Sequence, residues 1–451
     1  MVLAQYGLIR TIQVRNENVP GVLGVLATAI GDGGANIGNI ATVHISQNYV
    51  LRDIDVLVRD EEHLQELLYR INAVDHVRVL EARDEVLDLH RGGKIEVVSR
   101  HPVDSIAMLR KVYTPGVADV CLRIAAQPDQ ARLYTSINHT VAIITDGSAV
   151  LGLGNIGLAA AMPVMEGKAA LLHQFIGING VPLLIDAAGI EEFVEAVVRV
   201  APTFGGIHLE DIASPNCFEI VARLRKRLNI PVMQDDQDGT AAVVFGAVLA
   251  AAKATQQSLR QQTIGQIGLG AAGQAIADLL MHATDNPVLG ADLSGESLER
   301  HRSHGGIPSD IEEIMGKADL VVATTGVEGL IRPEMVRDGQ VILALSNPNP
   351  EIDPQLAIAH GARLAADGRS VNNVLGYPGI WSGALRTSAT QINREMLMAA
   401  GLVLADMSAG GELMPSPLDL EVHRRVGLKV AQAAVDSGVG VPDDTGDFEH
   451  P

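Results

Sequence analysis

The stretch "TIGQIGLGAAGQAIADLLM", Thr263 to Met281, decides the class of fold. It begins with a short apolar run typical of a buried strand and ends with the spacing of an amphipathic helix. Between the two, "GLGAAG" (Gly268 to Gly273) fits the G-x-G-x-x-G pattern. A strand that turns through glycines directly into a helix is the dinucleotide-binding fingerprint, so this region predicts a Rossmann-type domain with parallel strands.

An acid stands at the end of the next strand run, "NPVLGADL", where the fingerprint requires one. We expect this acid, Asp292, to bind the ribose hydroxyls and to repel a 2′-phosphate, which favours NAD. Arg300 and Arg302 downstream keep NADP as an alternative. The pyrophosphate is expected at the helix N-terminus and the turn before it, on Gly268, Gly270, Ala271, Ala272 and Gly273. An earlier "GLGNIG", Gly152 to Gly157, has no such acid and is interpreted as a loop whose backbone closely approaches a ligand.

Four earlier apolar runs, "VAIITDG", "PLLID", "GGIHLED" and "IPVMQDD", each end in an acid. Helix-like segments separate the later runs, which is typical of parallel strands whose carboxyl ends share one edge of a sheet. We therefore expect Glu210, Asp211, Asp235 and Asp236 to meet at one rim. Oxygen-only ligation suits Mg²⁺ or Mn²⁺, and the predicted ligands are Glu210, Asp211 and Asp236. Asp238, just before a long apolar helix, is predicted to be its N-cap.

Composition excludes several classes of partner. The 451 residues carry a net charge of −20, with 34 basic and 54 acidic residues, which argues against nucleic acid or an anionic membrane. The longest apolar stretch, around Ala241 to Ala252, is shorter than the roughly 20 residues that a membrane span needs. Cys121 and Cys217 form no disulfide framework, so a reducing cytoplasm is expected.

The N-terminal segment has a different character. Its strand-like and helix-like runs follow the order β-α-β-β-α-β of a ferredoxin-like unit, and it has no clustered His, Cys or nucleophile. Binding is therefore the better interpretation of its role. We predict an α/β protein of four segments: a regulatory domain over 1–88, a substrate and metal domain over 89–260, a dinucleotide-binding domain over 261–395, and C-terminal helices with an acidic tail over 396–451.

Two further residues could carry chemistry. Lys168, in "PVMEGKAALL", begins a helix among apolar residues, and this setting together with a nearby metal would lower its pKa, as a general base requires. A lysine that extends along the surface is the alternative. Tyr113 precedes a Pro-Gly turn in "VYTPGVADV" and by itself could be a packing residue.

Eight ordered motifs resemble bacterial malic enzymes over about residues 92 to 440. They are "VYTPGVADVC", "TDGSAVLGLGNIG", "PVMEGKAAL", "HLEDIASPNCFEI", "DDQDGTA", "GLGAAG", "LSNPNPEI" and "VNNVLGYPGIWSGAL". The N-terminal segment, with "NVPGVLG" and "GGANIGNI", resembles an ACT domain, a regulatory module that commonly binds amino acids at a dimer interface. The resemblance implies at least a homodimer and a small effector near Asn18 to Gly24 and Gly33 to Gly38, although a purely dimerising role is an equal alternative.

The resemblance also implies roles for individual residues. Tyr113 would be the general acid, Lys168 the general base, and Asp235 the partner of Lys168. Asn347 and Asn373 would contact malate and the nicotinamide end of the cofactor, and Thr325, at the end of the strand run "ADLVVATT", is assigned to the same cofactor site.

The sequence departs from the family pattern in two places. The common "HDDQHGTA" is here "QDDQDGTA", so that Gln234 and Asp238 replace two histidines beside the metal acids. Ser148 and Ala149 stand where larger eukaryotic relatives have a carboxylate-binding arginine, which makes the chain similar to the smaller bacterial form. The ligand acids are intact, so metal binding should survive.

The function implied is oxidative decarboxylation of L-malate to pyruvate and CO₂ with reduction of NAD⁺ and dependence on Mg²⁺ or Mn²⁺. One alternative is a malolactic-type decarboxylase that retains the hydride and yields lactate. The other is a catalytically inert metabolite-sensing protein. The matched acid, base and metal acids argue against a sensor.

Overall fold

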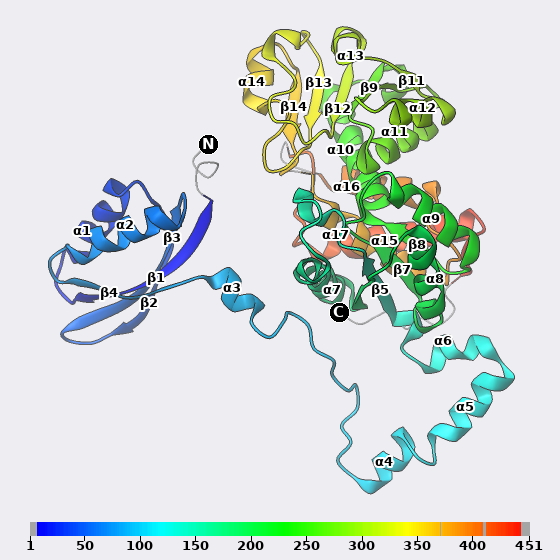
Figure 1. Cartoon of the computed structure of the whole chain (residues 1–451), viewed down its shortest axis with the longest axis horizontal. Coiled ribbons are helices and arrows are strands. Elements are labelled where there is room, and N and C mark those ends of the chain that lie inside the picture. The colour runs from blue at the N-terminus through cyan, green and yellow to red at the C-terminus, as the bar shows by residue number, and fades with distance from the viewer. Residues whose placement is uncertain (1–6, 370, 409–411, 443–451) are drawn as a thin grey trace. The chain divides into compact units, whose positions relative to one another are not determined.

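A computed structural model describes residues 7–369, 371–408 and 412–442 of the chain. The chain divides into two compact units, Met1–Glu96 and Val97–Pro451 (Figure 1). Each unit has apolar cores of its own. The acidic tail expected at the C-terminus lies largely outside the described residues.

The N-terminal unit is a four-stranded antiparallel sheet with two helices on one face. The strands lie in the order β2-β3-β1-β4, and Leu26 of the first helix and Leu67 of the second pack against Ile12 and Ile54 of the sheet. The predicted ferredoxin-like fold is confirmed. Its elements are β1 (Leu8–Glu17), α1 (Val22–Asp32), β2 (Asn36–Ile45), β3 (Tyr49–Val58), α2 (Glu61–Asn72), β4 (Val77–Arg83) and the short α3 (Glu85–His90).

The second unit begins with three helices that contain no buried residue, α4 (Ile106–Val112), α5 (Val117–Ala126) and α6 (Ala131–Tyr134). A parallel sheet follows, in the order β6-β5-β7-β8. Its strands are β5 (Thr140–Thr145), β6 (Asn179–Leu184), β7 (Gly206–Leu209) and β8 (Val232–Gln234). Apolar side chains of α8 (Ile190–Val200) and α9 (Asn216–Arg227) cover one face, and α7 (Met162–Ile176) lies on the other (Figure 1).

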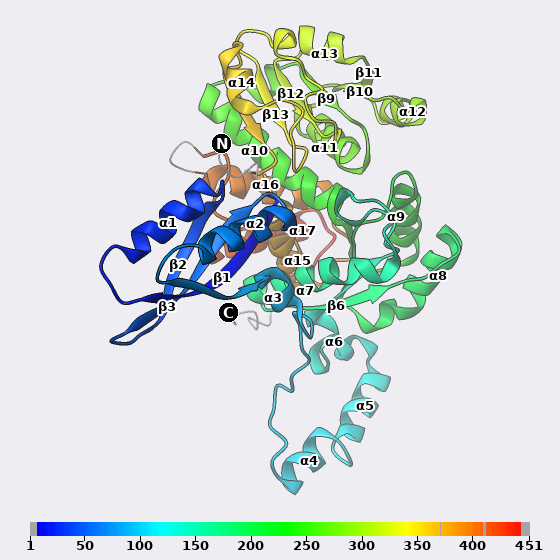
Figure 2. The same cartoon turned by 60° about the vertical axis from the view of Figure 1, so that its left-hand side comes forward.

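A second parallel sheet has the order β11-β10-β9-β12-β13-β14, so the direction in which strands are added reverses between β9 and β12. This is the strand order of a Rossmann domain, and ligands bind at such a reversal. Its strands are β9 (Ile264–Ile267), β10 (Leu289–Ala291), β11 (Ile307–Pro308), β12 (Leu320–Ala323), β13 (Val341–Ala344) and β14 (Leu364–Asp367). Its helices are α11 (Ala271–Thr284), α12 (Gly295–Ser303), α13 (Ile311–Lys317) and α14 (Pro354–Ala359) (Figure 2).

One strand prediction was wrong. The run Arg369 to Leu375 was expected to be a strand, but the edge strand is β14 and the short 3₁₀ turn η10 (Asn373–Leu375) follows it. The Asn372 side chain accepts a hydrogen bond from the Val374 amide at 3.0 Å, which holds this turn. Asparagine side chains that bond to the backbone in this way favour turns over strands.

A long helix joins the two sheets. The π-helical turn η7 (Asp235–Gly239) continues into α10 (Thr240–Thr255), which packs against α16 (Arg394–Met407). By length and composition alone Asp235–Thr255 could cross a membrane, contrary to our expectation, but 72% of its apolar window is buried within the protein. The remaining helices are α15 (Tyr377–Arg386) and α17 (Leu420–Asp436).

Candidate active site

Three acids gather at the carboxyl edge of the first sheet. Glu210 and Asp211 directly follow β7, and Asp236 follows the neighbouring strand β8 by way of η7. One carboxylate oxygen from each residue lies within 4.8 Å of the others. The parallel pairing of β7 with β8 is the reason, because it brings both strand ends to the same edge.

Glu210 pairs with Lys168, but Asp211 and Asp236 form no ion pair with any residue that the structure describes. Burial and the neighbouring Glu210 charge raise the pKa of Asp211 to about 6. Burial, followed by the charges of Glu210, Asp235 and Asp211, raises the pKa of Asp236 to about 7. Asp211 also holds a left-handed backbone with φ 52°, and its buried Oδ2 has no hydrogen-bond partner among the described residues. Strain, an unpartnered oxygen and repelling carboxylates together fit a divalent cation held by oxygen ligands.

Lys168 lies beside this cluster, on α7, with its side chain 11% exposed. Its Nζ forms an ion pair with Asp235 and a second one with Glu210 Oε1 at 3.2 Å. Burial by itself would lower the pKa of Lys168, but the two carboxylates outweigh burial and raise its pKa well above the usual value. The two acids thus oppose the lowering of the Lys168 pKa that its apolar sequence neighbours alone would cause.

Asn373 and Tyr377 complete the surroundings of the lysine. The Asn373 side-chain amide donates to Asp235 Oδ2 at 2.6 Å, which fixes the acid that pairs with Lys168. The ammonium of Lys168 lies 4.6 Å from the centre of the Tyr377 ring. Tyr377 is buried, and its hydroxyl has no partner among the described residues. It was not predicted, although it lies within one of the quoted motifs.

A buried pair of residues, His208 and Trp381, is linked by hydrogen bonds to Glu210. Trp381 Nε1 donates to His208 Nδ1 at 3.0 Å, which leaves the ring hydrogen on Nε2, and Nε2 donates to Glu210 Oε2 at 2.8 Å. Burial would raise the pKa of Glu210, but Lys168 and His208 outweigh it and lower this pKa. Neither aromatic residue was predicted. The available signal was that the only tryptophan of the chain falls inside one of the quoted motifs, at "GIWSGAL".

Gln234 and Asp238 form a hydrogen-bond network that includes the metal acid Asp236. The Gln234 side chain donates to Asp236 Oδ2 at 2.7 Å and accepts from the Gln237 amide at 2.7 Å. Asp238 accepts from the Gln234 amide at 3.0 Å and pairs with Arg225 at 2.6 Å. The predicted N-cap role of Asp238 is therefore wrong, since its carboxylate points back to β8 and α9 and makes no capping bond to α10.

The glycine turn of the second sheet has the geometry of a dinucleotide site. Gly268 has φ 87°, and a Cβ on Gly273 would lie 1.9 Å from the Gly268 carbonyl oxygen. A Cβ on Gly270 would meet nothing within 4 Å, so its backbone is open to a ligand. Ala271 and Ala272 begin α11. These are the close approach and the accessible helix N-terminus that pyrophosphate binding requires.

Asp292 lies at the end of β10, beside this turn. One carboxylate oxygen accepts from the Leu269 amide and the other from the Ser294 amide, each at 2.7 Å. These bonds hold the carboxylate at the edge of the turn. Arg300 is engaged with Glu296 at 2.9 Å and lies over the ring of Phe218.

A cavity of about 290 Å³ in the second unit is lined by residues of α10, by residues of η10 and by residues of the dinucleotide-type sheet and its helix α11. It is lined by Ala272 of α11, by Asn347 after β13 and by Asn373 of η10. Thr325 follows β12, where its amide and hydroxyl donate to the buried Glu351 at 2.6 and 2.9 Å. The predicted cofactor and substrate residues Asn347 and Asn373 thus line one cavity near the start of α11, while Thr325 is bound to Glu351.

Tyr113 is not brought to this site within one chain. It follows α4 and is 68% exposed. Both views show α4 and α5 apart from the sheet that carries the acids (Figures 1 and 2). The residue before the "GLGNIG" loop, Leu151, by contrast, lies beside the acids, since its backbone hydrogen-bonds to Asp211 and partly offsets the rise in the pKa of this acid.

Comparisons with known proteins agree with this geometry. The family model "Malic enzyme, N-terminal domain" matches residues 92–190 and 187–225, and an ACT domain model matches residues 9–81. The chain is 51% identical to NAD-dependent malic enzyme 1 of Bacillus subtilis, covering 95% of this chain and 98% of the relative. It is 40% identical to NADP-dependent malic enzyme of Halomonas elongata, covering 79% and 94%.

A solved structure supports the same assignment. The crystal structure of malic enzyme from Pyrococcus horikoshii is 38% identical, with a TM-score of 0.75, covering 80% of this chain and 92% of that one. Sequence identity, a family model and a shared fold thus agree along most of the chain. The chain therefore belongs to the malic enzyme family.

Proposed function

We propose that the protein converts L-malate and NAD⁺ to pyruvate, CO₂ and NADH with the help of Mg²⁺ or Mn²⁺. One observation carries the proposal: a buried lysine lies against a cluster of three acids, within the same unit as a dinucleotide turn. A sensor would have no need of this combination. A malolactic reaction would need the same groups, so the two are separated by whether NADH accumulates.

Glu210, Asp211 and Asp236 would hold the divalent cation. When bound, the cation supplies Lewis-acid stabilisation for negative charge on the substrate oxygen, and NAD⁺ supplies the hydride acceptor. The His208–Trp381 pair would keep the Glu210 carboxylate in place. Asn347 and Asn373 would orient malate and the nicotinamide end of the cofactor.

Lys168 would take the proton from the malate hydroxyl. The acids that raise its pKa in the metal-free chain include Glu210, a proposed metal ligand. Neutralising Glu210 with a cation removes one of the two charges that hold the proton on the amine, which moves Lys168 toward the free base that the reaction requires. Asp235 and Asn373 would keep the amine aimed at the substrate.

Tyr113 would protonate the carbon of the enolate formed on loss of CO₂, and we propose that it does so in the site of a second copy. The support is the exposure of Tyr113 together with apolar neighbours on α4 and α5, which are also exposed: Ile106, Leu109, Val112 and Leu122. Covering such a surface favours a homodimer. Mixing inactive Lys168→Ala and Tyr113→Phe proteins should restore activity in the mixed dimer; no recovery after subunit exchange would exclude shared sites.

NAD⁺ is the expected cofactor, with NADP⁺ accepted less well. Asp292 supports this preference, because its carboxylate would repel a 2′-phosphate at the ribose. Some relatives are named as NAD-dependent and others as NADP-dependent, so the ratio of activities with the two cofactors has to be measured. Cytoplasmic location is proposed from the two unpaired cysteines, Cys121 and Cys217.

The ACT unit is proposed to bind a small effector. A hollow of about 620 Å³ in this unit touches Asn18, in the predicted effector segment, and Arg15, Tyr49 and Arg78. The second predicted segment, Gly33 to Gly38, does not line it. Arg78→Ala should abolish an amino-acid response of malate turnover if the hollow binds the effector, and an unchanged response would leave dimerisation as its role.

The deciding experiment measures NADH and pyruvate from L-malate with NAD⁺ or NADP⁺, with and without Mn²⁺. Lys168→Ala should reduce kcat by about 10² to 10⁴ while leaving the folded structure intact. Lys253→Ala, an exposed lysine on α10, is the matched control and should retain full activity. Lactate formed without NADH would replace the proposal with the malolactic reaction.

A further inference from the structure

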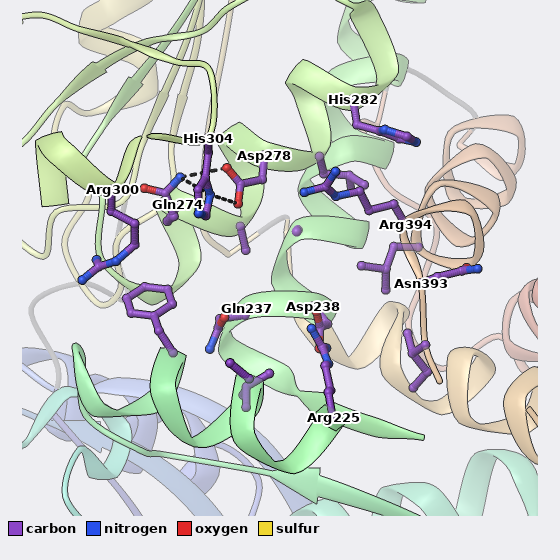
Figure 3. A pocket seen from close by; sticks show the side chains of 18 of the residues that line it. Arg225, Gln237, Asp238, Gln274, Asp278, His282, Arg300, His304, Asn393 and Arg394 are labelled. Atoms are coloured by element: carbon purple, nitrogen blue, oxygen red, sulfur yellow. Dashed lines mark hydrogen bonds and ion pairs between the residues drawn. The ribbon is translucent and has the colours of Figure 1, made fainter. Parts of the chain in front are cut away.

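A further and larger cavity is lined by Gln237 and Asp238 of η7. It has a volume of about 760 Å³ and lies among α9, η7, α11, α12 and the start of α16 (Figure 3). Apart from Arg300, which was considered for NADP, none of the residues assigned to catalysis, metal or cofactor lines it. We call it the α9–α11 cavity.

Three residues of the cavity lining each have a buried polar atom without a partner in the described part of the chain. Among the described residues, Gln274 Oε1, Gln237 Nε2 and Arg300 Nη1 are buried and have no hydrogen-bond partner. Gln274 is only 1% exposed, and its Nε2 is already bonded to Asp278 at 2.8 Å. Buried polar groups are nearly always paired in proteins, so one acceptor and two donors together indicate a missing polar ligand.

The charges of the lining are mixed. Asp238 pairs with Arg225, Asp278 with His304 and Glu395 with His282, at 2.6, 2.8 and 3.6 Å. Arg394 has no ion pair with any residue that the structure describes. Figure 3 shows Arg300 and Gln274 on one side of the cavity, Arg394 and His282 on the other, and Gln237 below them.

These groups match a small zwitterion. The Arg300 guanidinium, held over the ring of Phe218 at 4.2 Å, and the Gln237 amide are donors suited to a carboxylate. Gln274 Oε1 requires a donor from the ligand, which an ammonium supplies, and the adjacent Asp278 would favour its charge. A simple carboxylate would leave Gln274 unpaired.

The same cavity is connected to the metal acids through η7. The backbone N–H of Gln237 donates to Gln234 Oε1, and Gln234 Nε2 donates to Asp236 Oδ2, both at 2.7 Å. A ligand that binds the Gln237 side chain and fixes the backbone of this residue therefore acts on a proposed metal ligand through two hydrogen bonds. Both sites share one short segment of backbone, which is a contiguous route for coupling.

We propose that the α9–α11 cavity binds a small α-amino acid and that its occupancy changes the affinity of the acid cluster for a divalent cation. The carboxylate would meet Arg300 and Gln237, and the ammonium would meet Gln274. Nothing in malate turnover requires this cavity, so the inference goes beyond the proposed function.

The test is calorimetric titration of the full-length, metal-free protein with L-glutamate and L-aspartate, and with succinate and inorganic phosphate for comparison. At least one amino acid should bind saturably, and Arg300→Gln should weaken it about tenfold or more. Arg302→Gln, an exposed arginine on the same helix, is the matched control and should bind as the parent does. Thermal unfolding of each variant, with Arg300→Lys as the milder change, separates loss of binding from loss of fold.

Several outcomes would overturn the proposal. An amino-acid site here would be excluded if neither amino acid bound, or if Arg300→Gln bound as tightly as the parent. It would also be excluded if succinate or phosphate bound as tightly as the amino acids. Loss of binding in Arg78→Gln, in the hollow of the N-terminal unit, would assign the ligand to that unit. If the two sites are coupled, a saturating amino acid should change the Mn²⁺ dissociation constant at least about threefold. An unchanged dissociation constant would exclude the coupling. These readouts do not depend on malate turnover, so either proposal can fail alone.

Discussion

Acidification should expel the metal well before it unfolds the protein. The perturbation is a change from pH 7.5 to pH 5.5 with Mn²⁺ present. Burial and neighbouring carboxylates raise the pKa of Asp211 to about 6 and that of Asp236 to about 7. A metal binds the ionised carboxylates, so every proton that these two acids take up competes with Mn²⁺.

The magnitude follows from the two pKa values. With the acids treated as independent, both are ionised in about 74% of chains at pH 7.5 and in about 0.7% at pH 5.5. The Mn²⁺ dissociation constant should therefore rise about 100-fold over this interval. Binding should release about 0.3 protons per metal at pH 7.5 and about 1.7 at pH 5.5.

The assay is calorimetric titration of Mn²⁺ in two buffers with different ionisation enthalpies at each pH, which yields affinity and proton release together. A change of less than about threefold in affinity, or the same proton release at both pH values, would refute the reasoning. Asp211→Asn should bind Mn²⁺ more weakly and reduce the pH dependence to that of about one proton.

The metal-free protein should show the opposite trend in stability. An acid whose pKa is higher in the folded chain than its ordinary value of 3.8 binds more protons folded than unfolded between about pH 4 and 7. The contribution of Asp211 and Asp236 to the free energy of unfolding therefore falls as pH rises through this window. Thermal unfolding with chelator should show it, and Asp236→Asn should flatten the curve.

Three substitutions test the remaining geometry. Trp381→Phe removes the donor to His208, which itself bonds to the metal acid Glu210. The free energy of unfolding should therefore fall by about 2–4 kcal/mol, and the affinity for Mn²⁺ should fall about tenfold. Phe193→Leu, in the core of the same sheet, is the control and should destabilise the protein without weakening Mn²⁺ binding. Gly273→Ala places a Cβ 1.9 Å from a carbonyl oxygen of the glycine turn. It should weaken the binding of NAD⁺ at least about tenfold, as measured by fluorescence titration. Gly316→Ala, whose Cβ would meet nothing within 4 Å, is the control and should bind NAD⁺ normally. Asp292→Asn removes the repulsion of a 2′-phosphate, and the ratio of kcat/KM for NADP⁺ to that for NAD⁺ should rise about tenfold; an unchanged ratio would show that another group selects the cofactor.

Local sequence determined most of the architecture. Apolar runs that end in acids and alternate with helices specify parallel strands, and parallel strands must end at the same edge. For this reason the strand pattern alone was enough to predict that Glu210, Asp211 and Asp236 meet. The glycine turn from Gly268 to Gly273 was equally predictable, because only glycine permits its positive φ and its close contact.

Contacts between distant segments were decided by the tertiary structure alone. His208 and Trp381 are 173 residues apart, and no periodicity indicates that one supports Glu210 through the other. The strand expected at Arg369 to Leu375 failed because the side-chain bond of Asn372 stabilises a turn, and the N-cap expected at Asp238 failed because Arg225 on α9 captures its carboxylate.

The state of Lys168 shows the difference most clearly. Its sequence neighbours are apolar and small, and burial among them would lower its pKa, so local reasoning favours the free base. Folding adds Glu210 and Asp235, which directly follow β7 and β8, and Coulomb attraction to both outweighs the loss of hydration. Sequence determines which groups are present and which way each strand points, while only the fold sets the distances on which charge interactions depend.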